Sequence, residues 1–383
     1  MDPIYPVKPQ LDKKEYDSVM EVLLSGFLAE GNKTKQLEKE FAEYTGAKHA
    51  VFAANGTLAL YLALESLDLP VGKEIITTGF TFIASSNSCA YVGTIPKFVD
   101  INPKTFNIDP EAIEAAITKD TVAIMPVHIF GNPANMKVIM EIAEKHDLKV
   151  IEDCAQAHGA KIDSKHVGNF GDVGCFSFYA SKNMIAGEGG MVITNDDELA
   201  KKMRSIKNHG RAADSFGGYA HFRIGYNFRA PDINAAIALE QLRKLPGMLI
   251  DRKRNAEFYH KEMADLPLQF QETIPEGEHC NYICAPALTT DKITVSEVVE
   301  KTKEAKIFCR ALYDTPTYKQ PAYLNINENW KWAKAGIKYP DYSKLSLPVT
   351  EKISKTHFEI PVHPGVSQEA AEYITSVLKN ILE

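Results

Sequence analysis

Short apolar runs alternate with segments of helical period over the first two thirds of the chain. Seven apolar runs predict strands buried on both faces, at residues 49–54, 74–78, 95–100, 122–127, 148–152, 173–178 and 190–194. Helical stretches separate many of them, at residues 57–67, 110–117, 134–146 and 197–208. Because this alternation is typical of parallel strands joined by helices, we expect an α/β domain with a mainly parallel sheet.

The pattern changes after residue 230. A long helix is predicted from residue 233, and it continues past Pro246 and Gly247 into a charged segment. Fewer clear strands follow, and helical runs are predicted at 295–306 and 368–382. We therefore predict a large domain of residues 1–245, which includes an N-terminal helical arm, and a smaller C-terminal α/β domain of residues 246–383.

Composition excludes several classes of protein. A net charge of −7 and a pI near 5.9 argue against nucleic acid as a partner, because phosphate binding requires a basic face. The six cysteines have neither CxxC nor zinc-type Cys/His spacing, so we expect reduced core residues and no metal site. No basic segment precedes an apolar run, and no run is long enough to cross a bilayer, so we expect a soluble, cytoplasmic protein without a membrane partner.

Lys182 lies in an unusual setting for a lysine. Aromatic and small residues flank it, and glycines at positions 187, 189 and 190 follow. Desolvation favours a neutral amine, which is a nucleophile toward carbonyl groups. A surface lysine beside a glycine turn is the alternative, and Lys182 alone does not decide between the two.

Asp153 ends an apolar strand, where a carboxylate requires a cationic or donor partner. The ring nitrogen of pyridoxal 5′-phosphate (PLP) is such a partner, since an aspartate keeps the ring protonated while a lysine binds the aldehyde. A helix cap or a buried ion pair is the alternative for Asp153 alone. The combination of Asp153 with Lys182 favours PLP.

The segment after the first predicted strand suits a phosphate group. Gly56 allows the backbone to approach an anion closely, and the Thr57 hydroxyl and the free N–H groups of the first helical turn donate to it. Ser177, five residues before Lys182, would add a hydroxyl to the same phosphate. Phe82 follows another strand end and offers a flat face for a pyridine ring, with a core phenylalanine as the alternative. These residues fall at carboxyl ends of predicted strands, where such sheets bind ligands.

Several spaced motifs agree, in order, with one known family. They are NGT at 55–57, PVHIFGN at 126–132, EDCAQAHG at 152–159, SFYASK at 177–182, GEGG at 187–190, GYNFR at 225–229, LP at 347–348 and PVHP at 361–364. Together they resemble the sugar aminotransferases grouped as the DegT/DnrJ/EryC1/StrS family, and the resemblance covers nearly the whole chain.

The resemblance implies a fold type I PLP enzyme, an aspartate-aminotransferase-like homodimer with active sites at the subunit interface. It also implies roles by position: Lys182 would bind the aldehyde of the cofactor and later move the proton, and Asp153 would pair with the pyridinium. The other implied cofactor contacts are Gln156 near the ring and its 3′-oxygen, Phe82 stacked on the ring, Gly56, Thr57 and Ser177 at the phosphate, and Asn227 reaching the phosphate of the neighbouring subunit.

Two positions limit which residue roles can be transferred from the family to this chain. Arg229 has a planar guanidinium suited to a carboxylate or phosphate, and a structural role in its loop is the alternative that we favour. Many family members have a proline-histidine pair before a QPAY-like string, whereas here Thr317 follows Pro316 in DTPTYKQPAY, residues 314–323. Because that region helps shape the sugar-facing side, we do not assign the position of amino transfer.

We therefore expect a PLP-dependent aminotransferase that moves an amino group from glutamate, with glutamine as the alternative donor, to a keto group of a nucleotide-linked sugar. The mechanism would be ping-pong, and the product would serve amino-sugar and polysaccharide biosynthesis. A PLP-dependent nucleotide-sugar dehydratase is one alternative, although family members of that kind have histidine in place of the lysine. A regulatory protein that only binds a ligand on this scaffold is another, although the chain has no appended basic helix-turn-helix.

Overall fold

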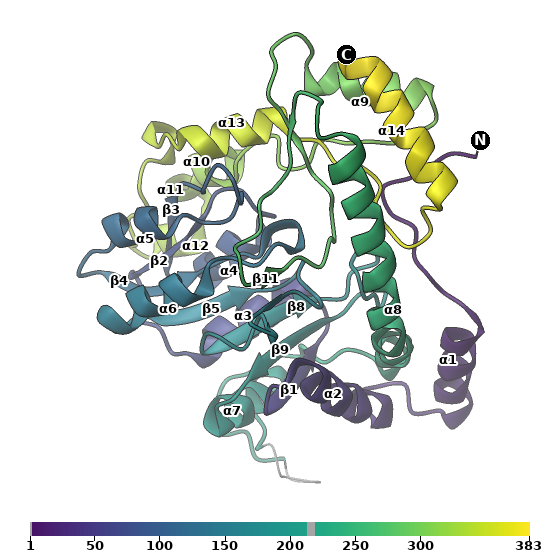
Figure 1. Cartoon of the computed structure of the whole chain (residues 1–383). Coiled ribbons are helices and arrows are strands. Elements are labelled where there is room, and N and C mark those ends of the chain that lie inside the picture. The colour runs from purple at the N-terminus through teal and green to yellow at the C-terminus, as the bar shows by residue number, and fades with distance from the viewer. Residues whose placement is uncertain (1, 213–218) are drawn as a thin grey trace.

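The seven predicted strands form one sheet in the computed structural model, which describes residues 2–212 and 219–383. The strand order is β1-β9-β8-β5-β4-β2-β3 (Figure 1). The strands are β1 His49–Ala53, β2 Glu74–Thr78, β3 Ile95–Val99, β4 Thr121–Met125, β5 Lys149–Asp153, β8 Val173–Ser177 and β9 Gly190–Thr194. Only β9 runs antiparallel to its neighbours, which confirms the mainly parallel mixed sheet.

Both faces of this sheet are buried, as the continuous apolar runs predict. Alternate strand residues enter different cores, because side chains of a strand point to opposite faces in turn. Val51 and Ile151 join one core with helices α3, α4 and α7. Phe52 and Val150 face the opposite side, which is covered by α2, α5, α6 and α8.

The predicted helices are all present, with ends shifted by at most two residues. The helices are α1 Lys13–Ser25, α2 Asn32–Thr45, α3 Gly56–Ser66, α4 Ala84–Tyr91, α5 Pro110–Ala116, α6 Met136–Lys145, α7 Asp197–Lys207, α8 Asp232–Glu262, α9 Val295–Glu304, α10 Pro321–Leu324, α11 Ile326–Asn329, α12 Lys331–Lys334, α13 Pro348–Thr356 and α14 Gln368–Leu382. Short 3-10 turns lie at Ile129–Gly131, Thr317–Lys319 and Tyr342–Lys344, and two-residue strands at β6 Lys161–Ile162, β7 Lys165–His166, β10 Leu268–Gln269, β11 Gly277–Glu278 and β12 Ala287–Leu288.

Helix α8 joins the sheet to the C-terminal part of the chain. It is continuous through Pro246, and Figure 1 shows it running from beside α2 toward α9 and α14. Its last turns pack into a core with those two helices. Residues 317–347 pack elsewhere, on the edge strand β3 and helix α4, and both tryptophan indoles donate to backbone carbonyls of Ala90 and Tyr91. The division into two domains at residue 245 stays a prediction.

The N-terminal segment lies along the outside of the molecule. Ile4 pairs with Ile307, and α1 packs against α8, where the buried Glu15 accepts a hydrogen bond of 2.7 Å from Gln241. All six cysteines are buried and free, as predicted. No helix in the described part of the chain is both long and apolar enough to span a membrane.

Candidate active site

A cavity of about 800 Å³ opens at the carboxyl edge of the sheet. The loops after β1, β2, β5 and β8 all contribute to its wall, because their strands are parallel and end at the same edge. Seven of the eight predicted site residues line it: Gly56, Thr57, Phe82, Asp153, Gln156, Ser177 and Lys182. The structure therefore brings together residues that lie up to 126 positions apart in the sequence.

The predicted phosphate site lies where α3 begins. Asn55 caps this helix by accepting a hydrogen bond of 2.9 Å from Leu58 N–H. Gly56 packs directly on Ser177, since a Cβ atom at Gly56 would lie 2.6 Å from Ser177 Cβ and 2.8 Å from its Oγ. The helix N-terminus, the Thr57 side chain and the Ser177 hydroxyl thus share one wall of the cavity, an arrangement that suits an anion.

Asp153 is buried at the end of β5. Ser85 Oγ donates to Asp153 Oδ2 at 2.7 Å and Ala155 N–H donates to Oδ1 at 3.0 Å. Burial raises the pKa of the Asp153 carboxyl, and the hydrogen bonds from Ser85 and Ala155 and the charge of Lys182 act in the opposite direction. The structure records no ion pair for Asp153 among the described residues, so the ion-pair alternative is not realised. A buried carboxylate with an open side toward the cavity fits a cationic ring nitrogen.

Gln156 is fixed at both ends of its amide. Phe130 N–H donates to Gln156 Oε1 at 2.8 Å, and Gln156 Nε2 donates to Tyr313 Oη at 2.9 Å. Phe130 and Tyr313 both have left-handed backbone, with φ of 59° and 55°, and their rings stack with centroids 6.0 Å apart. Such backbone is costly for aromatic residues, so the surrounding packing must impose it. These contacts hold the amide at the cavity wall.

Lys182 lies on a loop that closes on itself between β8 and β9. Phe178 N–H donates to Gly189 O at 2.8 Å and Ala186 N–H donates to Phe178 O at 2.7 Å, and these two bonds close the loop that contains Lys182. Lys182 Nζ lies 4.7 Å from the centroid of the Tyr282 ring, so the amine faces an aromatic wall of the cavity. Lys182 is partly buried and its amine has no carboxylate within ion-pair distance in the described chain.

Phe82 is not a core residue. It is 59% exposed and lines the cavity, which leaves a face of its ring open to a ligand. The alternative of a core phenylalanine is therefore wrong. Whether the ring stacks on a cofactor stays a prediction.

Asn227 does not line the cavity of its own chain. It is exposed and its backbone pairs with Asn208 in an isolated bridge. Arg229, two residues on, donates from Nη1 to Asn208 Oδ1 at 2.5 Å. This contact stabilises the loop, which is the structural role that the sequence analysis favours for Arg229. A contact of Asn227 with a neighbouring subunit stays a prediction.

Thr317 and Tyr318 lie behind the cavity wall. Thr317 donates from Oγ1 to Thr81 O at 3.2 Å, and the buried Tyr318 donates to Glu351 at 2.8 Å. The segment that departs from the family pattern thus supports the loop before Phe82 and does not line the cavity.

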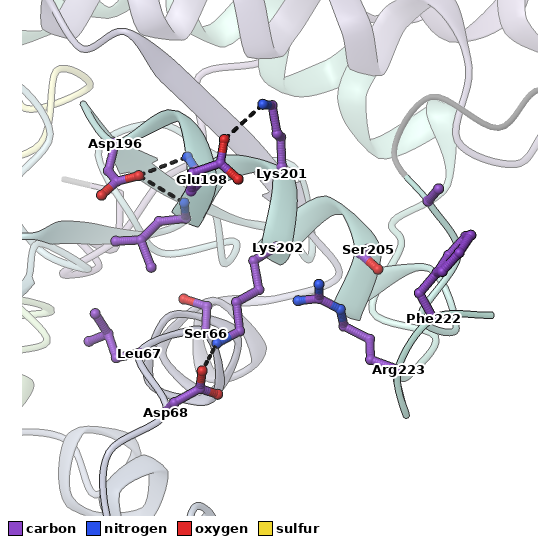
Figure 2. Close-up of a pocket in the computed structure, with 12 residues that line it drawn as sticks. Ser66, Leu67, Asp68, Asp196, Glu198, Lys201, Lys202, Ser205, Phe222 and Arg223 are labelled. Atoms are coloured by element: carbon purple, nitrogen blue, oxygen red, sulfur yellow. Dashed lines mark hydrogen bonds and ion pairs between the residues drawn. The ribbon is translucent and has the colours of Figure 1, made fainter.

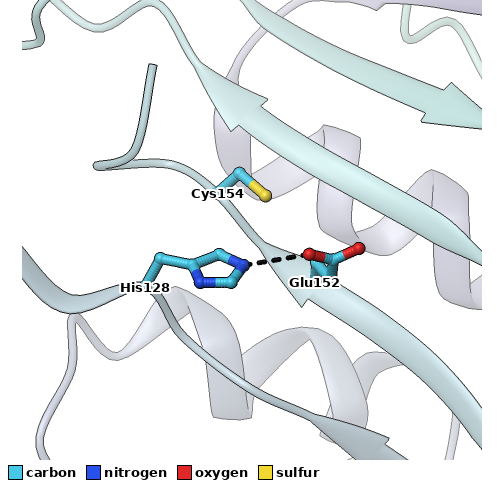
Figure 3. A group of neighbouring side chains, drawn as sticks. All are labelled: His128, Glu152 and Cys154. Atoms are coloured by element: carbon cyan, nitrogen blue, oxygen red, sulfur yellow. Dashed lines mark hydrogen bonds and ion pairs between the residues drawn. The ribbon is translucent and has the colours of Figure 1, made fainter. Parts of the chain in front are cut away.

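A buried cluster of His128, Glu152 and Cys154 has the residue types of a metal site (Figure 3). Ala134 N–H donates to His128 Nδ1 at 3.0 Å, so Nε2 holds the proton and donates to Glu152 at 3.1 Å. Glu152 also accepts hydrogen bonds from backbone N–H groups of residues 168, 170 and 171 at 2.7 to 2.8 Å. Because these bonds occupy the lone pairs that would bind a cation, the cluster is a structural network beneath the cavity.

A second hollow, of about 680 Å³, lies between the end of α3, helix α7 and residues 222–223 (Figure 2). Its charges are paired: Lys202 of α7 pairs with Asp68 across the hollow, and Lys201 pairs with Glu198 on the same helix. None of the predicted site residues lines it.

Sequence reasoning missed several cavity residues that carry polar or charged groups, among them Ser85, Tyr282, Arg310 and Tyr313. Ser85 lies three residues after Phe82, so the carboxyl-end rule for parallel strands could have found it. Tyr282, Arg310 and Tyr313 come from irregular segments of the last third of the chain, where no periodic pattern gives their position.

The family model of the DegT/DnrJ/EryC1/StrS aminotransferases matches residues 9–379. The chain belongs to this family, and its fold is that of the PLP-dependent sugar aminotransferases. It is 37% identical over 354 residues to a UDP-N-acetyl-3-dehydro-α-D-glucosamine 3-aminotransferase of Acidithiobacillus ferrooxidans, covering 92% of this chain and 89% of that protein.

Two solved structures share the fold over nearly their whole lengths. An aminotransferase from Psychrobacter cryohalolentis superposes with a TM-score of 0.88 at 31% identity, covering 98% of each chain. A putative sugar aminotransferase of Streptococcus pneumoniae, solved in its PMP form, gives a TM-score of 0.88 at 25% identity, covering 98% of this chain and 96% of that one.

Proposed function

We propose that this protein is a PLP-dependent aminotransferase that transfers an amino group from glutamate to a keto group of a nucleotide-linked sugar. The observation on which the proposal depends most is that Lys182 and the buried Asp153 line one cavity in a sugar-aminotransferase fold. The name of the Acidithiobacillus relative supports a UDP-linked amino sugar as the class of product. We place the enzyme in amino-sugar and polysaccharide biosynthesis in the cytoplasm.

The residues of the cavity fit PLP. Asp153 is a buried carboxylate for which no ion pair is recorded among the described residues, and Gly56, Thr57 and Ser177 line the cavity together at the start of α3, where an anion would find N–H and hydroxyl donors. Lys182 lines the same cavity. When bound, PLP supplies an electron sink that stabilises the negative charge formed when the α-proton of an amino acid is removed.

Each residue would have a separate role toward this chemistry. Asp153 would keep the ring nitrogen protonated, and Gln156, fixed by Phe130 and Tyr313, would orient the ring. The phosphate would be bound by Gly56, Thr57 and Ser177, and Phe82 would cover one face of the ring. Lys182 Nζ would accept the α-proton of the donor and return it to the cofactor carbon, acting as general base and then as general acid.

The two substrates would use the same cavity in turn. Glutamate would bind first and leave as 2-oxoglutarate, and the keto sugar would then bind and leave as the amino sugar. A cavity of about 800 Å³ lies within the range of small-molecule sites.

We also propose that the active enzyme is a homodimer. Asn227 lies on an exposed segment in which Tyr219, Phe222 and Ile224 are 70–91% exposed. Exposed apolar side chains of this number mark an interaction surface. Light scattering of the cofactor-bound protein would give twice the 42.5 kDa chain mass if this is right, and a monomer mass would contradict it.

The two alternative functions are not favoured. A dehydratase of this family would have histidine where this chain has Lys182, and a regulatory protein would have no use for the Asp153 and Lys182 pair. Both alternatives predict that no amino group is transferred.

Substitution of Lys182 tests the proposal directly. Lys182→Ala should abolish transamination in an assay that couples 2-oxoglutarate formation to a dehydrogenase, and Lys182→Arg, which keeps the charge, should do the same because arginine cannot exchange a proton at neutral pH. Lys201→Ala, on α7 away from the cavity, is the matched control and should keep full activity. Retained transamination in Lys182→Ala would contradict the assignment.

A further inference from the structure

The cavity contains a second positive charge that the proposed cofactor chemistry does not use. Of the described residues that line it, Lys182 and Arg310 are the two basic ones. Lys182 is assigned to the aldehyde. Arg310 comes from the irregular segment after α9, and its side chain is 42% exposed, toward the space that substrates must enter.

Backbone pairing fixes the position of Arg310. Glu359 N–H donates to Arg310 O at 2.8 Å, and Ile360 N–H donates to Cys284 O at 2.8 Å. Segments 282–287, 310 and 357–360 are thereby joined behind the cavity. Tyr282, whose ring faces Lys182, belongs to the same set of paired segments.

A buried carboxylate holds the guanidinium. Arg310 Nε donates to Glu359 Oε2, and the Glu359 side chain is only 3% exposed. Burial raises the pKa of Glu359, and the positive charges of Arg310, Arg252 and Lys182 oppose that rise. A buried acid is costly unless it is paired, so Glu359 is best explained as the residue that positions Arg310.

The opposite edge of the guanidinium remains open to a ligand. The recorded side-chain hydrogen bond of Arg310 uses Nε, which leaves Nη1 and Nη2 as donors. Two parallel N–H groups match the two oxygens of a carboxylate, and arginine is the residue that makes this bidentate contact best. Glutamate needs such a partner, because its carboxylates enter the cavity together with the amine that would take the place of Lys182 at the cofactor aldehyde.

We propose that Arg310 binds a carboxylate of the amino donor, and that Glu359 positions its guanidinium for this contact. The proposal rests on the proposed function, since it names the subsite for glutamate. Gly56, Thr57 and Ser177 already provide a separate place for the cofactor phosphate, so the cofactor does not require Arg310. The diphosphate of the sugar nucleotide is the competing anion, and the experiment must separate it from the donor.

Binding of glutarate tests the subsite without any reaction. Glutarate has both carboxylates of glutamate but no amine, so calorimetry on the PLP-loaded protein reports recognition alone. Arg310→Gln should weaken glutarate binding by roughly 30-fold or more, as expected for the loss of one partner of a charge-assisted contact. UDP binding, measured in parallel, should change by less than about twofold.

Arg243→Gln is the matched control. Arg243 is 41% exposed and also pairs with a glutamate, Glu40, at 2.8 Å, but it lies on α8 outside the cavity. This variant should bind glutarate like the wild type. If Arg310→Gln binds glutarate normally, or loses UDP and keeps glutarate, the proposed donor subsite is wrong.

Glu359→Gln tests whether Glu359 positions Arg310. It is also the second test of the subsite if Arg310→Gln does not fold. It should raise the KM for glutamate several-fold with little change in kcat, since it loosens Arg310 without removing it. A general folding defect would instead lower the amount of active protein and leave KM unchanged, which would overturn the positioning role. Wild-type protein that binds PLP and glutarate but does not convert glutamate would refute the proposed function and leave the subsite standing.

Discussion

Gly56→Ala is the substitution whose effect follows most directly from the geometry. The new Cβ would lie 2.6 Å from Ser177 Cβ, 2.8 Å from Ser177 Oγ and 3.2 Å from Ser177 Cα. Carbon atoms in contact prefer about 3.5–4.0 Å, so one of the two segments must move. Ser177 ends β8, which is paired on both sides by β5 and β9, and it cannot shift cheaply.

The expected cost has two parts. Overpacking of this kind costs about 1–3 kcal/mol in free energy of unfolding. The shift should also move the first turn of α3 away from Ser177 and separate the donors that would bind the cofactor phosphate. We therefore expect reduced stability in urea and weaker PLP binding, by roughly tenfold for each 1.4 kcal/mol lost at the site.

The assay compares four proteins by urea unfolding and by PLP titration followed through absorbance. Gly247→Ala is the control, because a Cβ at Gly247 meets nothing within 4 Å, and it should stabilise α8 by up to about 1 kcal/mol. Gly56→Ala combined with Ser177→Gly removes the two closest atoms, Ser177 Cβ and Oγ, and should recover most of the lost stability but not the phosphate affinity. Wild-type stability and PLP affinity in Gly56→Ala alone would refute the reasoning.

Three further substitutions test the surroundings of the site. Asp153→Asn removes a buried charge, so the cofactor-free variant should be as stable as the wild type or more stable by about 1 kcal/mol. The same variant should bind PLP more weakly. Lower stability without a change in PLP binding would contradict this prediction. Glu152→Gln should cost about 3 kcal/mol in urea unfolding, since its amide cannot accept from all four of its donors, and a loss under 1 kcal/mol would argue against the network. Burial lowers the pKa of His158 from 6.5 to about 3, so the unfolded chain binds one more proton than the folded chain between these pH values. The contribution of neutral, buried His158 to the free energy of unfolding is therefore complete above pH 6.5. It falls by about 1.4 kcal/mol per pH unit as the pH is lowered toward 3. His158→Phe should therefore show a shallower loss of stability between pH 6 and 4 than the wild type, and equal slopes would contradict the assignment.

The regular part of the fold follows from sequence because its signal is local. Residues such as Val150 and Ile151 alternate between two cores, and the apolar run that contains them is the signature of a strand buried on both faces. Because parallel strands carry ligand-binding residues at their carboxyl ends, Gly56, Asp153 and Ser177 are predicted to lie at one edge of the sheet without any knowledge of side-chain packing.

The C-terminal wall of the cavity could not be predicted in the same way. Arg310 reaches the cavity because its backbone pairs with Glu359, 49 residues away, through a single isolated bridge. Tyr313 depends on a left-handed backbone that the sequence does not signal, since left-handed positions usually hold glycine or asparagine. Phe82 was identified by position, but its exposure was visible only once the packing of α4 was known.

The central claim is that Lys182 and Asp153 form a PLP site that accepts an amino group from glutamate. The most direct test is the visible absorption spectrum of the PLP-loaded protein before and after addition of glutamate, with 2-oxoglutarate measured in the same sample. The account predicts that the band of the lysine-bound cofactor is replaced by that of the amine form, with one 2-oxoglutarate released per site, and that Lys182→Ala shows neither change. A wild-type band that persists with glutamate, with no 2-oxoglutarate formed, would contradict it.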